Sequence, residues 1–276
     1  MCLAIVALRA HPRCALVIAA NRDEFHARAA APARWWDEGW LAGRDLAAGG
    51  TWLGVTRAGR WALLTNVRDP ANQDPRAPSR GALVTRCLAA SGDPSAVLDA
   101  IVSSGAGHNG FNLLVGARDD AHWGSNREAG TRALATGVHG LSNHRLDTPW
   151  PKVVRTRAAV AAWCADGGDG AVDIAPLFRI LGARQPAADS ELPQTGIPLA
   201  RERLLSAPFI VSDDYGTRSS TVLTIAPDGE ARFVERSFDA AGRATGEVDF
   251  RFRISSAGAP ARAAGSGLSS LCGRTA

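Results

Sequence analysis

Cys2, the second residue of the chain, combines a reactive side chain with a position that suits nucleophilic catalysis. When the initiator Met1 is removed, Cys2 becomes the N-terminal residue, so that one residue carries both a thiol and a free α-amine. A free thiol has a pKa of about 8.5 and an α-amine a pKa of about 7.7 to 8.0, so the amine can accept the thiol proton near neutral pH. The alternative is that Cys2 is a small apolar residue opening a strand, because free cysteines are commonly buried and inert.

Charged residues are expected beside Cys2, in the sequence Asn21-Arg22-Asp23-Glu24. Arg22 would favour the thiolate and lower the pKa of the thiol. Asp23 would hold the N-terminal ammonium group or orient the arginine. We therefore interpret the start of the chain as a centre of acyl transfer.

A predicted hairpin brings these residues together. Apolar runs over residues 3–8 and 15–20 are typical of buried strands, and Pro12 between them marks a turn because it cannot donate a strand hydrogen bond. A hairpin centred there pairs residues whose numbers sum to about 23. Cys2 then lies opposite Asn21 or one of its neighbours.

Three later polar residues are further candidates for the same site. Two predicted strands end on an asparagine, and the last β region carries an arginine; these residues are Asn66, Asn143 and Arg218. We expect them to converge on Cys2. A polar residue that closes a strand is also a common start of a turn, which is the structural alternative for both asparagines.

A segment rich in tryptophan, residues 25–50, is predicted to be irregular. Its rings form either a ligand-facing wall or a plug over a sheet, since tryptophan is usually well buried whatever its function. Trp35 and Trp36 from this segment, together with Asn21 and Trp52, are the candidate substrate-binding residues.

Composition excludes several classes of protein. The chain has 276 residues, 46% of them hydrophobic, which is enough for a sizeable core. The net charge is +4, but the arginines are scattered among acidic residues, so we predict no nucleic-acid partner. No apolar stretch is long enough to span a membrane, and Arg9 and Arg13 interrupt the first apolar run, so it is not a secretory signal.

The cysteines do not form a recognisable framework. Their number is odd, their spacing is wide and no CxxC occurs, so neither a zinc site nor a redox pair is indicated. Such usage suits a reducing compartment, and we expect a cytoplasmic protein.

The predicted elements alternate in blocks, which favours an α+β fold in layers over a βαβ fold. Two hairpins, two helices, a group of strands, two more helices and a terminal β-meander follow one another. The predicted helices span residues 80–90, 95–104, 149–164 and 172–181, and residues 186–203 are predicted to be a loop. Residues 1–254 would form a single domain, and residues 255–276, rich in Ser, Gly and Ala, a disordered tail. No phosphate loop, dinucleotide fingerprint or GxSxG motif occurs.

Several short motifs follow one another along the chain. They are the start Met-Cys-Leu-Ala-Ile, then Asn-Arg-Asp-Glu-Phe, Gly-Gly-Thr-Trp-Leu-Gly, Asn-Gly-Phe-Asn-Leu, Gly-Leu-Ser-Asn with Thr-Pro-Trp, and Tyr-Gly-Thr-Arg. This set resembles the NRDE family, also called the transport and Golgi organisation protein 2 family, up to about residue 254. That family is similar to the N-terminal nucleophile (Ntn) hydrolases, which implies a four-layer αββα sandwich of two antiparallel sheets flanked by helices.

The resemblance also implies roles for the matched positions. Cys2 would be the nucleophile, Arg22 and Asp23 its supporting charges, Asn143 and Asn66 the two oxyanion-hole positions, and Arg218 the late-chain arginine beside the nucleophile. The cysteine branch of the Ntn hydrolases includes penicillin V acylase and bile-salt hydrolase. The implied substrate is a small-molecule acyl amide, cleaved through a thioester without a cofactor.

A second class of function also follows from the resemblance, because eukaryotic relatives have been linked to haem handling and to lipid or Golgi homeostasis. The chain would then be a binding or trafficking protein on a hydrolase scaffold. Haem would need a cysteine thiolate or a histidine such as His11, His26, His139 or His144, although a lone histidine is more often a core or surface residue. The sequence does not determine the oligomeric state.

Overall fold

The first predicted hairpin is present and forms the centre of a six-stranded antiparallel sheet. The computed structural model describes residues 2–168 and 170–255. The strands of this sheet lie in the order β10-β1-β2-β11-β12-β13. Their bounds are β1 Cys2–His11, β2 Cys14–Phe25, β10 Gly137–Leu141, β11 Tyr215–Ile225, β12 Glu230–Phe238 and β13 Ala244–Arg253.

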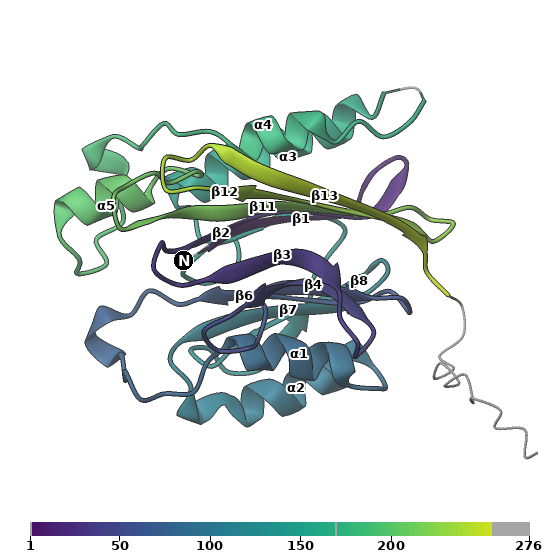
Figure 1. Cartoon of the computed structure of the whole chain (residues 1–276), viewed down its shortest axis with the longest axis horizontal. Coiled ribbons are helices and arrows are strands. Elements are labelled where there is room, and N and C mark those ends of the chain that lie inside the picture. Colours follow the sequence, from purple (N-terminus) through teal and green to yellow (C-terminus); the bar gives the residue numbers. More distant parts are fainter. Residues whose placement is uncertain (1, 169, 256–276) are drawn as a thin grey trace, which may run out of the picture.

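A second antiparallel sheet of seven strands lies against the first (Figure 1). Its strands follow one another in chain order, as expected for a meander of short connections. They are β3 Ala30–Trp35, β4 Trp40–Asp45, β5 Leu53–Thr56, β6 Arg60–Asn66, β7 Phe111–Ala117, β8 Asp120–Ser125 and β9 Thr131–Ala133.

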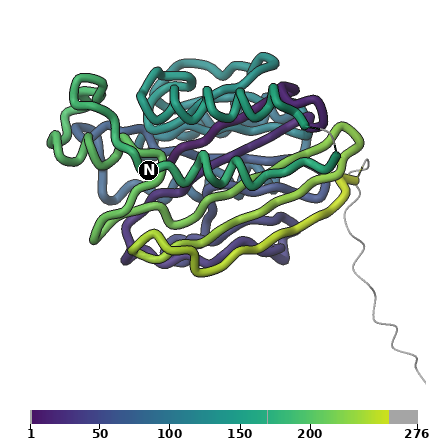
Figure 2. The backbone as a smooth tube through the Cα atoms, turned by 90° about the horizontal axis from the view of Figure 1, so that it is seen from above, coloured from purple at the N-terminus to yellow at the C-terminus, as the bar shows by residue number. Residues whose placement is uncertain are grey.

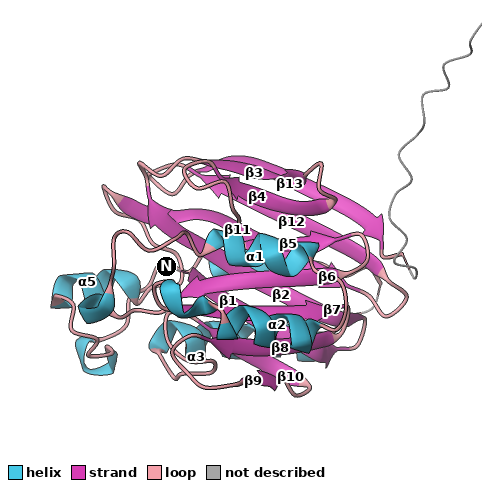
Figure 3. Ribbon diagram, turned by 90° about the horizontal axis from the view of Figure 1, so that it is seen from below, coloured by secondary structure: helices cyan, strands magenta, loops and turns pink. Residues whose placement is uncertain are grey.

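One pair of helices covers the outer face of each sheet. Figure 2 shows α3 and α4 lying over the six-stranded sheet, and Figure 3 shows α1 and α2 below the seven-stranded one. A fifth helix, α5, lies beyond the sheets at one end of the sandwich (Figure 1). The bounds are α1 Gly81–Ala89, α2 Pro94–Ser103, α3 Pro151–Asp166, α4 Ala175–Leu181 and α5 Leu199–Leu205. No helix in the described ranges is long and apolar enough to cross a bilayer.

The apolar run of β1 is continuous because this strand is buried on both faces. Val6 and Leu8 belong to the core between the two sheets, whereas Leu3 and Ile5 belong to the core beneath α3 and α4. Successive side chains of a strand point to opposite faces, so a strand between two cores needs apolar residues at every position. The α+β class and the predicted αββα sandwich are both confirmed.

The predicted helices occur within a few residues of their expected bounds, and Asp93 caps α2 by accepting hydrogen bonds from the backbone of Ser95 and Ala96. Two predictions were wrong. The segment 25–50 is not irregular, because it contains β3 and β4, and the expected loop over 186–203 contains the start of α5. The predicted tail begins at Ser255, and the rest of it lies outside the described residues.

Candidate active site

A cavity of about 270 Å³ lies where β1 begins, lined by residues of both sheets. Cys2 pairs with Arg22 in the β1–β2 ladder, which confirms the predicted pairing to within one residue. Three different strands, β1, β2 and β6, therefore bring the candidate residues to one place. The cavity is lined by Cys2, Arg22, Asp23, Trp52 and Asn66, among others.

Arg22 lies on the face of β2 that looks toward the second sheet. Its guanidinium stacks on the ring of Trp52, with 4.5 Å between Cζ and the ring centroid. One nitrogen, Nη2, is 4.0 Å from Glu24 Oε2. The other, Nη1, is buried and has no hydrogen-bond partner in the part of the chain that the structure describes.

Asp23 is buried at the next position of β2, and its Oδ1 accepts a hydrogen bond of 2.7 Å from Thr217 Oγ1. A bulge in β11 between Thr217 and Ser219 sets the position of that hydroxyl. Burial raises the pKa of Asp23, and the positive charges of Lys152 and Arg22 oppose this shift.

Lys152 is a component of the site that the sequence reasoning did not identify. It is the single lysine of the chain, and it stands at the second position of α3 with only 1% of its surface exposed. Burial lowers its pKa to about 8, while the charge of Asp23 opposes that change. The only feature of the sequence that distinguishes this residue is that it is a lysine, because all other basic residues apart from the histidines are arginines.

The thiol of Cys2 is not activated by its surroundings in this chain. Burial raises its pKa, and the negative charge of Asp23 acts in the same direction. Arg22 and a hydrogen bond from the backbone N–H of Asp23 oppose the shift. A thiol whose pKa is raised in this way depends on a base to accept its proton before it can act as a nucleophile.

Asn143 lies next to the cavity but does not line it. Its Nδ2 donates to the carbonyl of Asn66 at 2.9 Å, and its Oδ1 lies 3.2 Å from Ser142 Oγ. Ser142 Oγ also lies 2.9 Å from the carbonyl oxygen of Cys2, to which it donates. The end of β10 is thus tied to the start of β1 and to the end of β6. One of the two N–H bonds of the Asn143 amide is used in this way.

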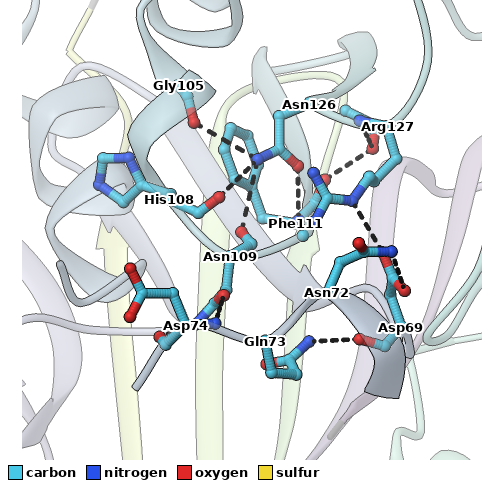
Figure 4. Close-up of polar contacts among 12 residues, drawn as sticks. Asp69, Asn72, Gln73, Asp74, Gly105, His108, Asn109, Phe111, Asn126 and Arg127 are labelled. Atoms are coloured by element: carbon cyan, nitrogen blue, oxygen red, sulfur yellow. Dashed lines mark hydrogen bonds and ion pairs between the residues drawn. The ribbon is translucent and has the colours of Figure 1, made fainter. Parts of the chain in front are cut away.

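Asparagines hold the loops around Asn109, a residue of the cavity wall, in place (Figure 4). Asn109, which lines the cavity, exchanges two hydrogen bonds of 2.8 Å with the backbone of Asp74. Asn126 Nδ2 donates to the carbonyls of Gly105 and His108, and its Oδ1 accepts from the backbone of Phe111. These bonds fix the segment that leads into residues 77–81 of the wall.

Asn21 is not at the cavity, although it was a candidate for substrate binding. Its Nδ2 donates to the carbonyls of Leu181 and Pro208, each at 2.9 Å, and its Oδ1 accepts from Ser220. Side chains alternate along a strand, so Asn21 and Arg22 point to opposite faces of β2. The amide of Asn21 joins the end of α4 to the sheet.

Trp35 and Trp36 do not reach the cavity either. Trp35 packs on the core between the sheets with Phe252, and Trp36 lies in the core beneath α1 and α2. Trp36 Nε1 donates to the carbonyl of Ala42 at 2.9 Å. Of the two alternatives, these rings therefore cover a sheet and do not form a wall that faces a ligand. Trp52 alone of the four substrate-binding candidates lines the cavity.

Arg218 lies in the bulge of β11, between Thr217 and Ser219. Its Nη1 donates to the carbonyl of His26 at 3.0 Å and lies 3.3 Å from His26 Nδ1. It is not among the residues that line the cavity. The structure thus brings Cys2, Arg22, Asp23 and Asn66 together, sets Asn143 beside them and leaves Arg218 outside.

The histidines considered as haem ligands also lie outside the cavity. His11 stacks on Trp163, and the other three are hydrogen-bonded to Ser212, Asp147 and Thr148; these are His26, His139 and His144. Within residues 2–168 and 170–255, no three His, Cys, Asp or Glu side chains are grouped as metal ligands would be.

Comparison with known proteins shows the family and the fold of this chain. A family model described as Transport and Golgi organisation 2 matches residues 1–240. The human "Transport and Golgi organization protein 2 homolog" is 34% identical over 242 residues, and that of Bos taurus is 33% identical over 241; each match covers 80% of this chain and 86% of the relative. The structure of the C2A mutant of conjugated bile acid hydrolase from Clostridium perfringens superposes with a TM-score of 0.50, at 7% identity and over 92% of both chains. That likeness extends to the fold, which is the Ntn-hydrolase sandwich.

Proposed function

The protein belongs to the Transport and Golgi organisation 2 family, and from this membership and the geometry of the cavity we propose that it is an amidohydrolase whose nucleophile is Cys2. The substrate is a small acyl amide, cleaved at its C–N bond. The observation that carries the proposal is that Cys2, Arg22, Asp23 and Asn66 line one cavity although they come from three strands. The conjugated bile acid hydrolase that shares the fold was solved as a C2A mutant, so its own second residue is also a cysteine.

Removal of Met1 supplies the missing base. Because β1 and β2 are antiparallel and Cys2 pairs with Arg22, the backbone nitrogen of Cys2 lies toward Asp23. The freed α-amine is then next to a buried carboxylate, which can hold its ammonium form. As the neutral amine, it accepts the thiol proton, and Arg22 stabilises the thiolate.

Acyl transfer then proceeds in two halves. The Cys2 sulfur attacks the amide carbonyl, a C–S bond forms, and the tetrahedral intermediate expels the amine as the C–N bond breaks. The α-ammonium returns its proton to the departing nitrogen. Water attacks the thioester carbonyl while the amine accepts one of its protons, the hydroxyl joins the acyl carbon, and the C–S bond breaks to release the carboxylic acid. The amine then returns the proton to the Cys2 sulfur. The products are a carboxylic acid and an amine.

The oxyanion of each intermediate lies between the ends of β6 and β10. Asn66 lines the cavity and is the donor that faces the substrate, and Asn143, buried beside it, holds it in place by donating to its carbonyl. Donors held in this way by other hydrogen bonds need no reorganisation when charge develops, and one donor is typically worth about 10²–10³ in rate.

The test begins with the intact mass of untagged protein, which shows whether Met1 has been removed. Turnover of a panel of short acyl amides is then compared for wild type, Cys2→Ala and Cys14→Ala. Cys14 is a buried free cysteine on β2 outside the cavity, and it serves as the matched control. We expect Cys2→Ala to lose about 10⁴-fold or more in kcat and Cys14→Ala to change less than about twofold.

Two results would overturn the proposal. Quantitative retention of Met1 would leave Cys2 without an α-amine. Equal turnover by wild type and Cys2→Ala would show that the reaction does not pass through the thiol. Trapping the acyl-enzyme by acid quench should add the mass of the acyl group to the N-terminal peptide of the wild type.

A further inference from the structure

We propose that the cavity selects amides that carry a carboxylate, and that Arg22, Arg80 and the first turn of α1 hold this group. The inference rests on the proposed hydrolase for the chemistry of the substrate. The binding site itself can be tested without turnover.

The charged side chains on the open side of the cavity are unbalanced. Arg28 binds Asp45 at 2.7 Å and lies 3.9 Å from Glu24, which is itself 4.0 Å from Arg22. In the described ranges, Arg80 has no carboxylate within ion-pair distance. The three guanidinium groups of Arg22, Arg28 and Arg80 therefore face only two carboxylates, those of Glu24 and Asp45. One positive charge remains for a ligand of opposite sign.

Asp23, the third carboxylate at the cavity, does not restore the balance. It is engaged by the hydroxyl of Thr217, and the charge of Lys152 acts on it from α3. In the proposed reaction it also receives the N-terminal ammonium group. Its negative charge is thus compensated on the side away from Arg80.

Arg22 supplies the clearest sign that a ligand is expected. Its side chain is only 6% exposed, it lines the cavity, and its buried Nη1 has no partner in the described part of the chain. A buried N–H of an ionised group without an acceptor is costly, so such a group usually has a ligand or an ordered water as its partner. An anion in the cavity that Arg22 lines would lie next to this incompletely paired guanidinium.

Arg80 faces the same cavity from the opposite wall. Its Nη1 donates to the carbonyl of Gly110 at 2.9 Å, which anchors the side chain and leaves its other N–H groups for a ligand. Burial lowers the pKa of Arg80, and the charges of Glu24 and Cys2 oppose the shift, which indicates that this guanidinium lies within electrostatic range of the nucleophile.

The N-terminus of α1 adds a third source of positive potential. Gly81, the first residue of this nine-residue helix, lines the cavity, and no side chain caps the helix at Arg80. A Cβ on Gly50 would overlap the backbone of Gly81, so the close approach of these two glycines positions the turn. Uncapped N–H groups and the helix dipole favour an anion at this point.

The size and remaining walls of the cavity limit the rest of the substrate. A volume of about 270 Å³ is at the lower end of ligand sites, which commonly span about 300–1,000 Å³. Trp52, Leu64 and Pro78 offer a small apolar surface next to the polar groups. This favours a short or compact acyl group over a long fatty chain.

The experiment measures binding to the full chain carrying Cys2→Ala, which removes turnover. The probes are N-phenylacetylglycine, its neutral primary amide and inorganic phosphate, titrated by calorimetry at low salt. We expect the carboxylate to bind about 10- to 100-fold more tightly than the amide, as for a charge-assisted pair of hydrogen bonds. Adding Arg80→Gln should bring that ratio close to one, and Arg80→Lys should restore part of it. Arg76, on the same loop with a side chain 91% exposed, provides the control Arg76→Gln, which should leave the ratio unchanged.

A ratio near one in the Cys2→Ala chain would overturn the proposal, and so would a ratio that Arg80→Gln leaves intact. Binding of phosphate in preference to the carboxylate would also overturn it. If the carboxylate binds as expected while the wild type hydrolyses nothing, the anion site stands and the proposed hydrolase fails. If the wild type hydrolyses neutral amides as fast as amides that carry a carboxylate, the proposed hydrolase stands and the anion site fails.

Discussion

Two arginine–tryptophan stacks with the same spacing have different roles in this protein. Arg22 lies 4.5 Å from the ring centroid of Trp52, and Arg44 lies 4.5 Å from that of Trp36. The ring of Trp36 is buried, and its N–H is satisfied within β4. Arg22 instead faces a cavity with an N–H that has no partner in the described ranges. The stacking geometry alone therefore does not mark a ligand site, whereas an unsatisfied donor at a cavity does.

The largest expected effect is on stability, and it tests the assignment of the Arg44–Trp36 stack to the core. Trp36→Ala should lower the free energy of unfolding by about 3–5 kcal/mol, because it removes a large ring from the core beneath α1 and α2. The value of kcat/KM per folded molecule should change less than about twofold. Urea denaturation and turnover under folding conditions measure the two quantities. Turnover that falls while stability is kept would place Trp36 in the site after all.

The centre of the site could be predicted because it depends on local sequence. The β1–β2 hairpin is set by two apolar runs and a turn at Pro12, so the neighbourhood of Cys2 and Arg22 followed from spacing alone. Asn66 was found for a similar reason, since it ends a strand of the second hairpin. Both positions could be predicted because each depends only on a hairpin, whose two strands are close together in the sequence.

The remainder of the site depends on contacts between distant segments, which spacing does not reveal. Lys152 lies within electrostatic range of Asp23 only because α3 packs on the first sheet, and Arg80 lines the cavity only because α1 packs on the second. The direction of the Arg218 side chain could not be read from spacing, because a bulge in β11 interrupts the alternation of side chains at this point. The strands β3 and β4 were missed because they are short, and β3 lies at a sheet edge, where the burial that produces an apolar pattern is incomplete.

Glu235, a buried residue of β12 that is hydrogen-bonded to both sheets, carries the next prediction. Its Oε1 accepts from the backbone of Ala33 on β3, and its Oε2 accepts from Thr221. Burial raises its pKa from 4.5 to about 7, although both hydrogen bonds and the charge of Arg22 oppose this. A carboxyl with a raised pKa contributes stability below pH 4.5 that is lost as the pH rises through 7.

Glu235→Gln should therefore flatten the dependence of stability on pH. The difference in unfolding free energy between pH 5 and pH 8 should change by about 3 kcal/mol relative to wild type, with the variant losing less on the alkaline side. Urea denaturation at the two pH values measures it. An identical pH dependence in the two proteins would show that Glu235 is already ionised at pH 5 in the folded state.

The smallest effect is expected from Gly43, where the tryptophan segment touches the cavity wall. A Cβ at this position of β4 would overlap the ring of Trp52 and approach Glu235 Oε1, so Gly43→Ala should displace the ring from Arg22. Losing a partly buried cation–π contact is worth about 1–2 kcal/mol, so kcat/KM should fall by about tenfold. Gly246→Ala on β13, where a Cβ meets nothing within 4 Å, is the control and should leave kcat/KM unchanged. If Gly43→Ala lowers the melting temperature but not kcat/KM, the stack on Trp52 is packing, like that on Trp36, and the two regions do not differ in the way proposed.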